Sequence, residues 1–139
     1  MTGAARSRAA LLARYWPGLV AATWEELCRQ RLPALAHPRL GAAGDWKPGA
    51  RWWSGAAPEW DVVAEDVAER RLLFGEAKLA GGDLRAQAAA LASRPPPILP
   101  ARFARHLVTR ALFVPDAPPR VRAVGDVAVV TARELFRRG

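Results

Sequence analysis

Residues 59–82, EWDVVAEDVAERRLLFGEAKLAGG, constrain the fold of this chain more than any other stretch. Two apolar runs, DVVA and LLFG, are separated by a short polar segment around residues 66–70. This pattern predicts two strands, 59–65 and 71–79, that pair antiparallel as a hairpin. If the turn is centred between Ala68 and Glu69, Asp61 lies directly across from Glu76, because both are equally far from the centre.

Charged side chains interrupt both of these apolar strands. Side chains alternate between the two faces of a strand. Asp61 on the first strand and Glu76 and Lys78 on the second are therefore expected to share one face, whereas Val62 and Ala77 point to the other face, toward the core. Two carboxylates and an ammonium group converge on one patch of the hairpin.

Such a patch suits a hard divalent cation. Two carboxylates, with a backbone carbonyl and waters, can complete the oxygen shell of Mg²⁺ or Mn²⁺. A lysine near one ligand can orient or deprotonate an attacking water and offset charge that develops on a phosphate. The alternative is a structural salt-bridge cluster on a solvated sheet face, with Glu59 as a charge at its rim.

The rest of the chain predicts further helices and strands around the hairpin. Pro17 is expected to end a first helix, and Asp83 is a good N-cap for a later one. The chain has no internal repeat and no long linker, which favours a single α/β domain. The expected helices cover residues 6–15, 17–35, 83–94 and a C-terminal turn at 132–138, and the expected strands cover residues 51–54, 59–65, 71–79, 106–114 and 127–131.

Length and composition are those of one folded domain. The chain has 139 residues, of which 51% are hydrophobic and six are tryptophans, enough for one core. We expect a single domain over residues 1–139, with a core from about 15 to 131 and an N-terminal helix over 1–14. The one cysteine, Cys28, excludes an intrachain disulfide. It falls in an apolar-periodic segment and is expected to be a core residue.

Charge and hydropathy bear on partners and location. No apolar run reaches the roughly 18 residues of a membrane helix, and the N-terminus lacks a secretory pattern. We therefore expect a cytoplasmic protein that does not enter a membrane. The net charge of +8 favours nucleic acid as a partner. A compositional bias toward arginine, with only two lysines in the chain, explains the charge equally well.

The hairpin resembles the motif of the PD-(D/E)XK nuclease superfamily. That motif is an acid at the end of one strand and (D/E)-x-K on the next, and this chain has Asp61 followed by Glu76-Ala77-Lys78. The proline that often precedes the aspartate is replaced by Trp60. The segment RWWSGAAPEWDVVAEDVAERRLLFGEAKL resembles one branch of this superfamily more closely, namely the nuclease-like C-terminal domain of archaeal and bacterial P-loop ATPases of unknown function. The resemblance extends from about residue 15 to 114 and is strongest over 51–79.

This resemblance implies a fold and a set of roles. The fold is restriction-endonuclease-like, a mixed β-sheet flanked by helices in the core order α-β-β-β-α-β. Asp61 and Glu76 would bind Mg²⁺ or Mn²⁺, and Lys78 would act on the attacking water. An aromatic–glutamate pair on an upstream helix is typical of the branch and is matched by Trp24-Glu25. Glu25 would add a third metal ligand or a base.

Three functions follow as hypotheses. The first is metal-dependent hydrolysis of DNA phosphodiester bonds, with Asp61, Glu76, Lys78 and Glu25 as catalytic residues. The second is a catalytically silent, nuclease-like module that binds nucleic acid. The third is a domain that docks on a P-loop ATPase. The chain contains no GxxxxGK[ST] motif, so we expect either a free-standing version or a fragment of a larger ATPase. The resemblance also leaves a homodimer open.

Overall fold

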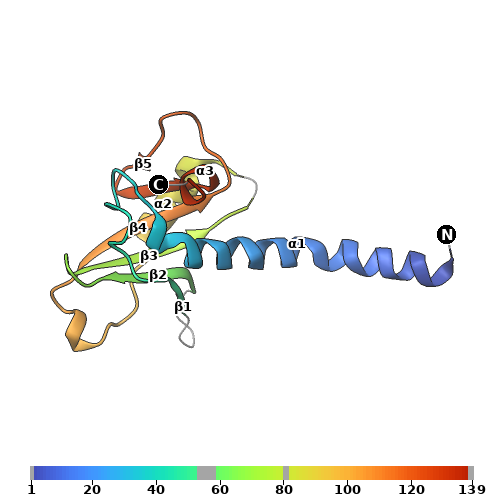
Figure 1. Ribbon diagram of the computed structural model, residues 1–139, viewed down its shortest axis with the longest axis horizontal. Coiled ribbons are helices and arrows are strands. Elements are labelled where there is room, and N and C mark those ends of the chain that lie inside the picture. The colour runs from blue at the N-terminus through green and yellow to red at the C-terminus, as the bar shows by residue number, and fades with distance from the viewer. Residues whose placement is uncertain (1, 53–58, 80–81, 138–139) are drawn as a thin grey trace.

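The computed structural model describes residues 2–52, 59–79 and 82–137. Within these residues, helices flank one six-stranded mixed sheet with the strand order β1-β2-β3-β4-β6-β5 (Figure 1). The prediction of an α/β fold with a mixed sheet flanked by helices is confirmed. In chain order the elements are α1 (Gly3–Arg31), η1 (Leu32–Ala34), β1 (Ala50–Trp52), β2 (Trp60–Asp66), β3 (Arg71–Ala77), α2 (Leu84–Ser93), η2 (Ala101–Phe103), β4 (Leu107–Val114), β5 (Ala123–Val124), β6 (Val127–Thr131) and α3 (Ala132–Leu135).

The β2–β3 hairpin has the predicted register. Its pairs run from Asp66–Arg71 to Val62–Gly75, which centres the turn between residues 68 and 69. Strand β3 then pairs parallel with β4, and β4 pairs parallel with β6. Parallel neighbours need a crossover, and α2 with the segment after it makes the crossover from β3 to β4. The carboxyl ends of β3, β4 and β6 therefore lie at one edge of the sheet.

The N-terminal region differs from the prediction. We expected two helices, 6–15 and 17–35, separated at Pro17, but α1 is a single helix from Gly3 to Arg31 that contains Pro17. A proline removes one backbone donor, and the alanines, leucines and arginines on both sides are strong helix formers. Helix α1 therefore continues through the proline. It also ends earlier than predicted, because Pro33 lies in the short 3₁₀ turn η1.

The other predicted elements match in position, the strand 127–131 has the same bounds as β6, and several others differ at their ends. The predicted strand 51–54 corresponds to β1, and positions 53 and 54 lie outside the described residues. Strand β3 ends at Ala77 rather than at residue 79. Helix α2 has Asp83 as its N-cap, and the Asp83 carboxylate accepts a hydrogen bond from the N–H of Arg85. Strand β5 was not predicted, because a two-residue strand has no periodicity to detect.

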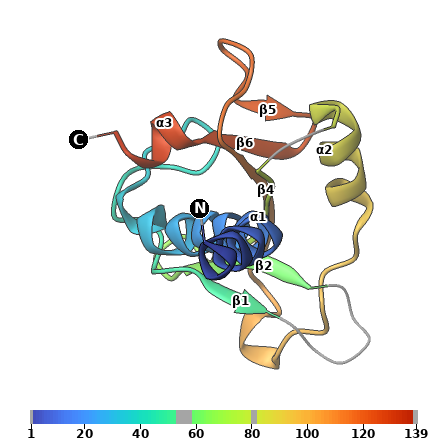
Figure 2. The same cartoon turned by 90° about the vertical axis from the view of Figure 1, so that its right-hand side faces the viewer.

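Each face of the sheet has its own apolar core, and α1 and α2 lie on opposite sides of the sheet (Figure 2). The C-terminal half of α1 packs against one face, and α2 packs against the other. Cys28 is fully buried, as predicted, and burial raises the pKa of its thiol to about 12. Buried members of the α1-side core include Trp24, Cys28, Val62, Leu73 and Phe113, and those of the α2-side core include Trp60, Leu72, Phe74, Leu91 and Leu112.

Gly75 allows β3 and β4 to pack closely beside the charged end of the hairpin. A Cβ atom at this position would lie 2.7 Å from a ring carbon of Phe113 and 3.2 Å from the carbonyl oxygen of Ala111. We predict that Gly75→Ala lowers the free energy of unfolding by about 1–3 kcal/mol, because overpacking a close-packed core forces its neighbours apart. Thermal denaturation followed by circular dichroism measures the change.

Gly18 in α1 provides the matched control for this substitution. A Cβ atom at Gly18 would meet no atom within 4 Å, and alanine favours a helix interior over glycine by roughly 0.5–1 kcal/mol. Gly18→Ala should therefore leave the melting temperature unchanged or raise it. A melting temperature of Gly75→Ala equal to that of wild type would contradict the packing argument.

Candidate metal and catalytic site

Asp61 lies where β2 begins, next to a β-bulge. Between the pairs Ala50–Val63 and Trp52–Trp60, β1 advances by two residues and β2 by three. Strand β2 therefore carries one extra residue between Trp60 and Val63. Bulges change the direction of side chains and are frequent beside active sites. The Asp61 Oδ2 atom accepts a hydrogen bond from the backbone N–H of Ala77, at 2.9 Å. The carboxylate is thereby tied to the end of β3.

Glu76 lies on the neighbouring strand, one residue beyond the last described pair of the hairpin, Val62–Gly75. Continuing this register places Glu76 opposite Asp61, as predicted. By alternation Glu76 shares its face with Leu72 and Phe74, which belong to the core beside α2. Glu76 is thus on the α2 side of the sheet, and its side chain is only 16% exposed.

Two cations contact the Glu76 carboxylate. Lys78 Nζ lies 3.3 Å from Glu76 Oε1, and Arg94 Nη2 lies 3.3 Å from Glu76 Oε2. The Lys78 side chain is 45% exposed, so its ammonium group is also accessible to a ligand from solvent. The structure therefore brings Asp61, Glu76 and Lys78 together at the carboxyl end of β3.

Glu25 approaches this site from the opposite face of the sheet, on α1. It is half-buried, and burial raises the pKa of its carboxyl. The negative charge of Asp61 raises this pKa further, whereas Arg29 and Arg51 act in the opposite direction. Glu25 is thus within electrostatic reach of Asp61. Among the described residues it has no ion pair with Lys78 or any other basic side chain.

Two arginines that the sequence did not predict hold the site. Arg29 on α1 donates a 2.7 Å hydrogen bond to the carbonyl oxygen of Asp61. It follows Glu25 by one helical turn, a spacing that could have indicated its position. Arg94, the C-cap of α2, donates to the carbonyl oxygen of Glu59 at 3.1 Å and lies over the Trp60 ring. No pattern in the local sequence indicates that Arg94 contacts the hairpin.

Glu59 lies at the rim of the site, as the alternative interpretation had it. Its side chain is 42% exposed and forms an ion pair with Arg51. This hydrogen-bonded partner lowers the pKa of Glu59. Glu59 is therefore a solvated, neutralised carboxylate, unlike the half-buried carboxylate of Asp61 two residues later.

Burial and negative charge together determine the protonation of Asp61. Burial raises the pKa of its carboxyl, the N–H of Ala77 lowers it, and the charges of Glu76 and Glu59 raise it, with a small lowering by Lys78. The net shift is upward from the ordinary value of 3.8. Ionisation of Asp61 is thus less favourable in the folded protein than in the unfolded chain, and a further positive charge would offset this difference.

The donors fit a hard cation only in part. Asp61 and Glu76 supply the carboxylate oxygens that Mg²⁺ prefers, and their mutual repulsion is what a bound cation would relieve. The residues that the structure describes contain no group of three or more His, Cys, Asp or Glu side chains placed to hold a metal ion. Metal binding at Asp61, Glu76 and Glu25 therefore stays a prediction. Lys78 and Arg94 contact the two oxygens of Glu76, so a cation would compete with them.

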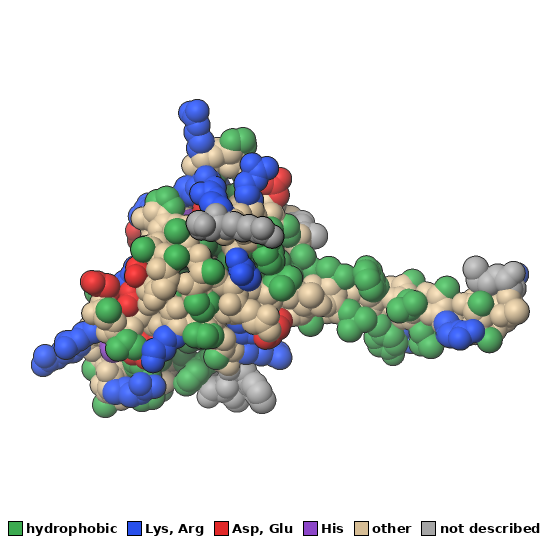
Figure 3. Space-filling view, viewed as in Figure 1, with side chains coloured by type: hydrophobic (Ala, Val, Ile, Leu, Met, Phe, Trp, Pro, Cys, Tyr) green, Lys and Arg blue, Asp and Glu red, His purple; other side chains and the backbone are tan. Residues whose placement is uncertain are grey.

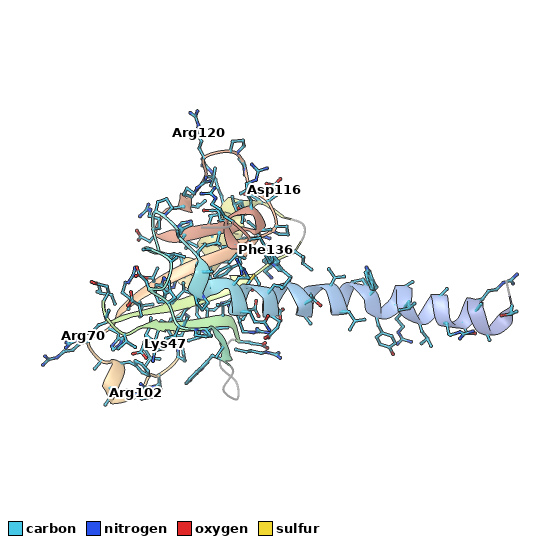
Figure 4. All side chains as sticks on the ribbon, in the orientation of Figure 1. Lys47, Arg70, Arg102, Asp116, Arg120 and Phe136 are labelled. Carbon is cyan, nitrogen blue, oxygen red and sulfur yellow. The ribbon has the colours of Figure 1, made fainter. Side chains whose placement is uncertain are left out.

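A pocket of about 330 Å³ opens beside Lys78. It is formed by the residues after β3, the first turns of α2 and the loop that follows β4, with Lys78, Gln87 and Asp116 among its lining residues. Figure 4 shows Asp116 beside the C-terminal part of the sheet, whereas Lys47, Arg70 and Arg102 lie at the far end of the molecule. Ligands of open α/β sheets commonly bind at the carboxyl ends of parallel strands, which is where this pocket lies.

Fold and site together define a mixed α/β protein with an acidic pair and a lysine at the carboxyl end of one central strand. Residues 5–90 match the model of a family described as archaeal and bacterial proteins of unknown function (DUF234), and the chain belongs to this family. The matched segment includes Glu25, Asp61, Glu76 and Lys78. No curated protein and no solved structure matches the chain. Among the described residues, no helix is both long and apolar enough to span a membrane.

The upward shift of the Asp61 pKa predicts a pH-dependent effect of Asp61→Asn. A group with a raised folded-state pKa stabilises the protein most below its unfolded value, and this contribution is lost as the pH rises through the folded pKa. Asn keeps the shape and the acceptor for Ala77 but carries no charge. Asp61→Asn should therefore gain stability relative to wild type at pH 7, and the gain should vanish as the pH falls toward 3.8. Paired thermal melts across this pH range measure the difference.

Glu59→Gln is the control for this experiment, because the Glu59 pKa is lowered. Stability from a lowered pKa is present above the unfolded value and is lost as the pH falls. Glu59→Gln should therefore lose stability at pH 7 relative to wild type. An Asp61→Asn variant that is less stable than wild type at pH 7, like the control, would overturn the electrostatic description of Asp61.

Proposed function

We propose that this chain carries a Mg²⁺- or Mn²⁺-dependent nuclease site that hydrolyses phosphodiester bonds of DNA. The observation that carries the proposal is the pairing of β2 with β3, which places Asp61 opposite Glu76 with Lys78 3.3 Å from Glu76. The resemblance of this hairpin to the PD-(D/E)XK motif and the net charge of +8 support DNA as the substrate. A cytoplasmic location is part of the same proposal.

Each residue has a role in this proposal. Asp61 and Glu76 would hold the cation, with Glu25 as a third carboxylate from α1. The cation would supply Lewis-acid activation of the phosphate and of the attacking water. Lys78, which is half-exposed and lines the pocket, would position the water and offset negative charge on the phosphate. Arg29 fixes the backbone of Asp61 through its carbonyl oxygen and is a positioning residue.

Divalent-metal binding tests the site without depending on turnover. Isothermal titration of the wild type with MnCl₂ should show binding that Asp61→Asn and Glu76→Gln abolish. Glu59→Gln should bind Mn²⁺ as the wild type does, since Glu59 is a rim carboxylate neutralised by Arg51. Cleavage of plasmid DNA with Mg²⁺ should then be lost in Lys78→Ala. Cleavage of equal rate in Lys78→Ala and wild type would point to a contaminating nuclease.

The pairing of Glu76 with two cations favours a second candidate function. With Lys78 and Arg94 on its two oxygens, Glu76 is already neutralised, which fits a catalytically silent module that binds nucleic acid. Docking on a P-loop ATPase is a further proposal that rests on the resemblance of the sequence alone.

Arg94→Gln distinguishes these two functions. If Arg94 competes with a metal for Glu76, its removal should lower the Mn²⁺ dissociation constant severalfold, because a nearby positive charge repels the cation. In the silent module, neither wild type nor Arg94→Gln should bind Mn²⁺ with an Asp61-dependent signal. Arg85→Gln, on an arginine of α2 that has no ion pair among the described residues, is the matched control and should leave the titration unchanged.

A further inference from the structure

A second pocket, of about 250 Å³, lies on the α2 side of the sheet, where the hairpin meets the chain around η2. Side chains of β1, β2 and β3 form one part of its lining, and residues 99–103 form another. Four of the six positions 95–100 are proline. Because proline fixes its own backbone angle, this wall is stiff, and a ligand would not have to order it. We define the η2 pocket by Lys47, Trp52, Glu65, Phe74, Arg102 and Phe103.

Three aromatic side chains line the η2 pocket. Phe74 is fully buried, whereas Trp52 and Phe103 are half-buried. The Nε1 donor of Trp52 is buried and has no hydrogen-bond partner among the residues that the structure describes. Buried donors are normally paired. An occupant that carries acceptor atoms on a flat apolar ring therefore fits this pocket better than a hydrocarbon does.

Two exposed cations stand at the rim of the η2 pocket. Lys47 and Arg102 both line it, and both lie at the end of the molecule where Figure 3 shows several Lys and Arg side chains (Figures 3 and 4). The Arg102 guanidinium lies over the Phe103 ring, 3.9 Å from its centroid. Within the described part of the chain, neither cation forms an ion pair. Both are therefore available to an anion.

Nearby acids already have basic partners. Glu65 is the one acid among the described residues that line the pocket, and its carboxylate lies 3.0 Å from Nε2 of His106. Asp66, the next residue, and Asp45, two residues before Lys47, both contact Arg71. An anion at the rim would thus meet two unpaired cations and acids that other side chains hold.

We propose that the η2 pocket binds one unpaired base of a single DNA strand, with Lys47 and Arg102 on the phosphates that flank it. A nucleotide accounts for all three features of the pocket, since its base supplies a flat ring with acceptor atoms and its phosphate supplies the negative charge. Proteins hold single strands by this combination of aromatic stacking and basic side chains. A base within a duplex is paired and stacked, so it cannot enter such a pocket without leaving the helix.

The η2 pocket lies along the same strand as the candidate site. Leu72 and Phe74 line it, and both share a face of β3 with Glu76. At about 3.3 Å per residue, these side chains are roughly 7 and 13 Å from Glu76 along the strand. A few nucleotides of one strand, at about 3.4 Å each when stacked, span this distance. The inference rests on the proposed function for DNA as the polymer and adds that the substrate is single-stranded here.

Fluorescence anisotropy with an end-labelled oligothymidylate in EDTA tests the pocket without metal and without turnover. Wild type should bind this strand at least about fivefold more tightly than an abasic strand of equal length, because the abasic strand has no base to stack. It should also bind the single strand more tightly than a duplex of equal length, whose bases are not free to enter the pocket.

Trp52→Phe tests the contact with the base. This substitution removes the unpaired donor and reduces the ring, so it should weaken binding of the oligothymidylate severalfold and leave binding of the abasic strand unchanged. Trp16→Phe is the matched control, on an exposed tryptophan of α1, and should bind both strands as the wild type does. Thermal melts of both variants show that the fold is kept.

Lys47→Gln and Arg102→Gln test the phosphate contacts on two exposed positions. Each should weaken both strands alike and reduce the slope of log affinity against log salt by about 0.7, the value for one phosphate contact with a single strand. Arg133→Gln is the matched control, on an exposed arginine of α3 that has no ion pair in the described part of the chain. It should leave the slope unchanged.

Equal affinity of the wild type for the oligothymidylate and the abasic strand, or equal effects of Arg102→Gln and Arg133→Gln, would overturn the inference. Thymidine monophosphate that binds as tightly as the oligothymidylate would overturn it too, and would assign the pocket to a free nucleotide. Strand binding that depends on Trp52, in a protein that neither binds Mn²⁺ nor cleaves DNA, would support the pocket and reject only the nuclease. Cleavage at the same rate in Trp52→Phe and wild type, with no preference for single strands, would reject only the pocket.

Discussion

The antiparallel pairing of β2 with β3 is the interaction on which the candidate site depends. Strand side chains alternate with a period of two, so a register slip of one residue would exchange the faces of every residue in the hairpin. The observed register places Val62 in the core beside α1 and Glu76 on the α2 side. The same pairing brings the N–H of Ala77 to the Asp61 carboxylate.

Helices on opposite faces of the sheet complete the site through two arginines. Arg29 contacts the Asp61 backbone from α1, and Arg94 contacts Glu76 from the end of α2. These contacts leave the two carboxylates unequal. Glu76 is paired with Lys78 and Arg94, whereas Asp61 is half-buried beside negative charge and has a raised pKa. A bound cation would mainly offset the negative charge at Asp61.

The sequence predicted those parts of the fold that depend only on a few neighbouring residues. The alternation in the hairpin and the N-cap at Asp83 act over a few residues, and both predictions are confirmed. The predicted break at Pro17 was wrong, because strong helix formers on both sides favour the helix even though a proline in its interior costs about 3 kcal/mol. The bulge beside Asp61 could not be predicted, since it depends on where β1 pairs.

The sequence by itself determined that an acid on β2 and the Glu76-Ala77-Lys78 run on β3 meet across a hairpin, because turn length and alternation are local properties. Only the tertiary structure decided what surrounds those charges. It brought Glu25 near Asp61 from α1 and placed Arg94 on Glu76. Those contacts join segments separated by loops and a crossover, and their geometry follows from how the helices pack on the sheet, which no local pattern encodes.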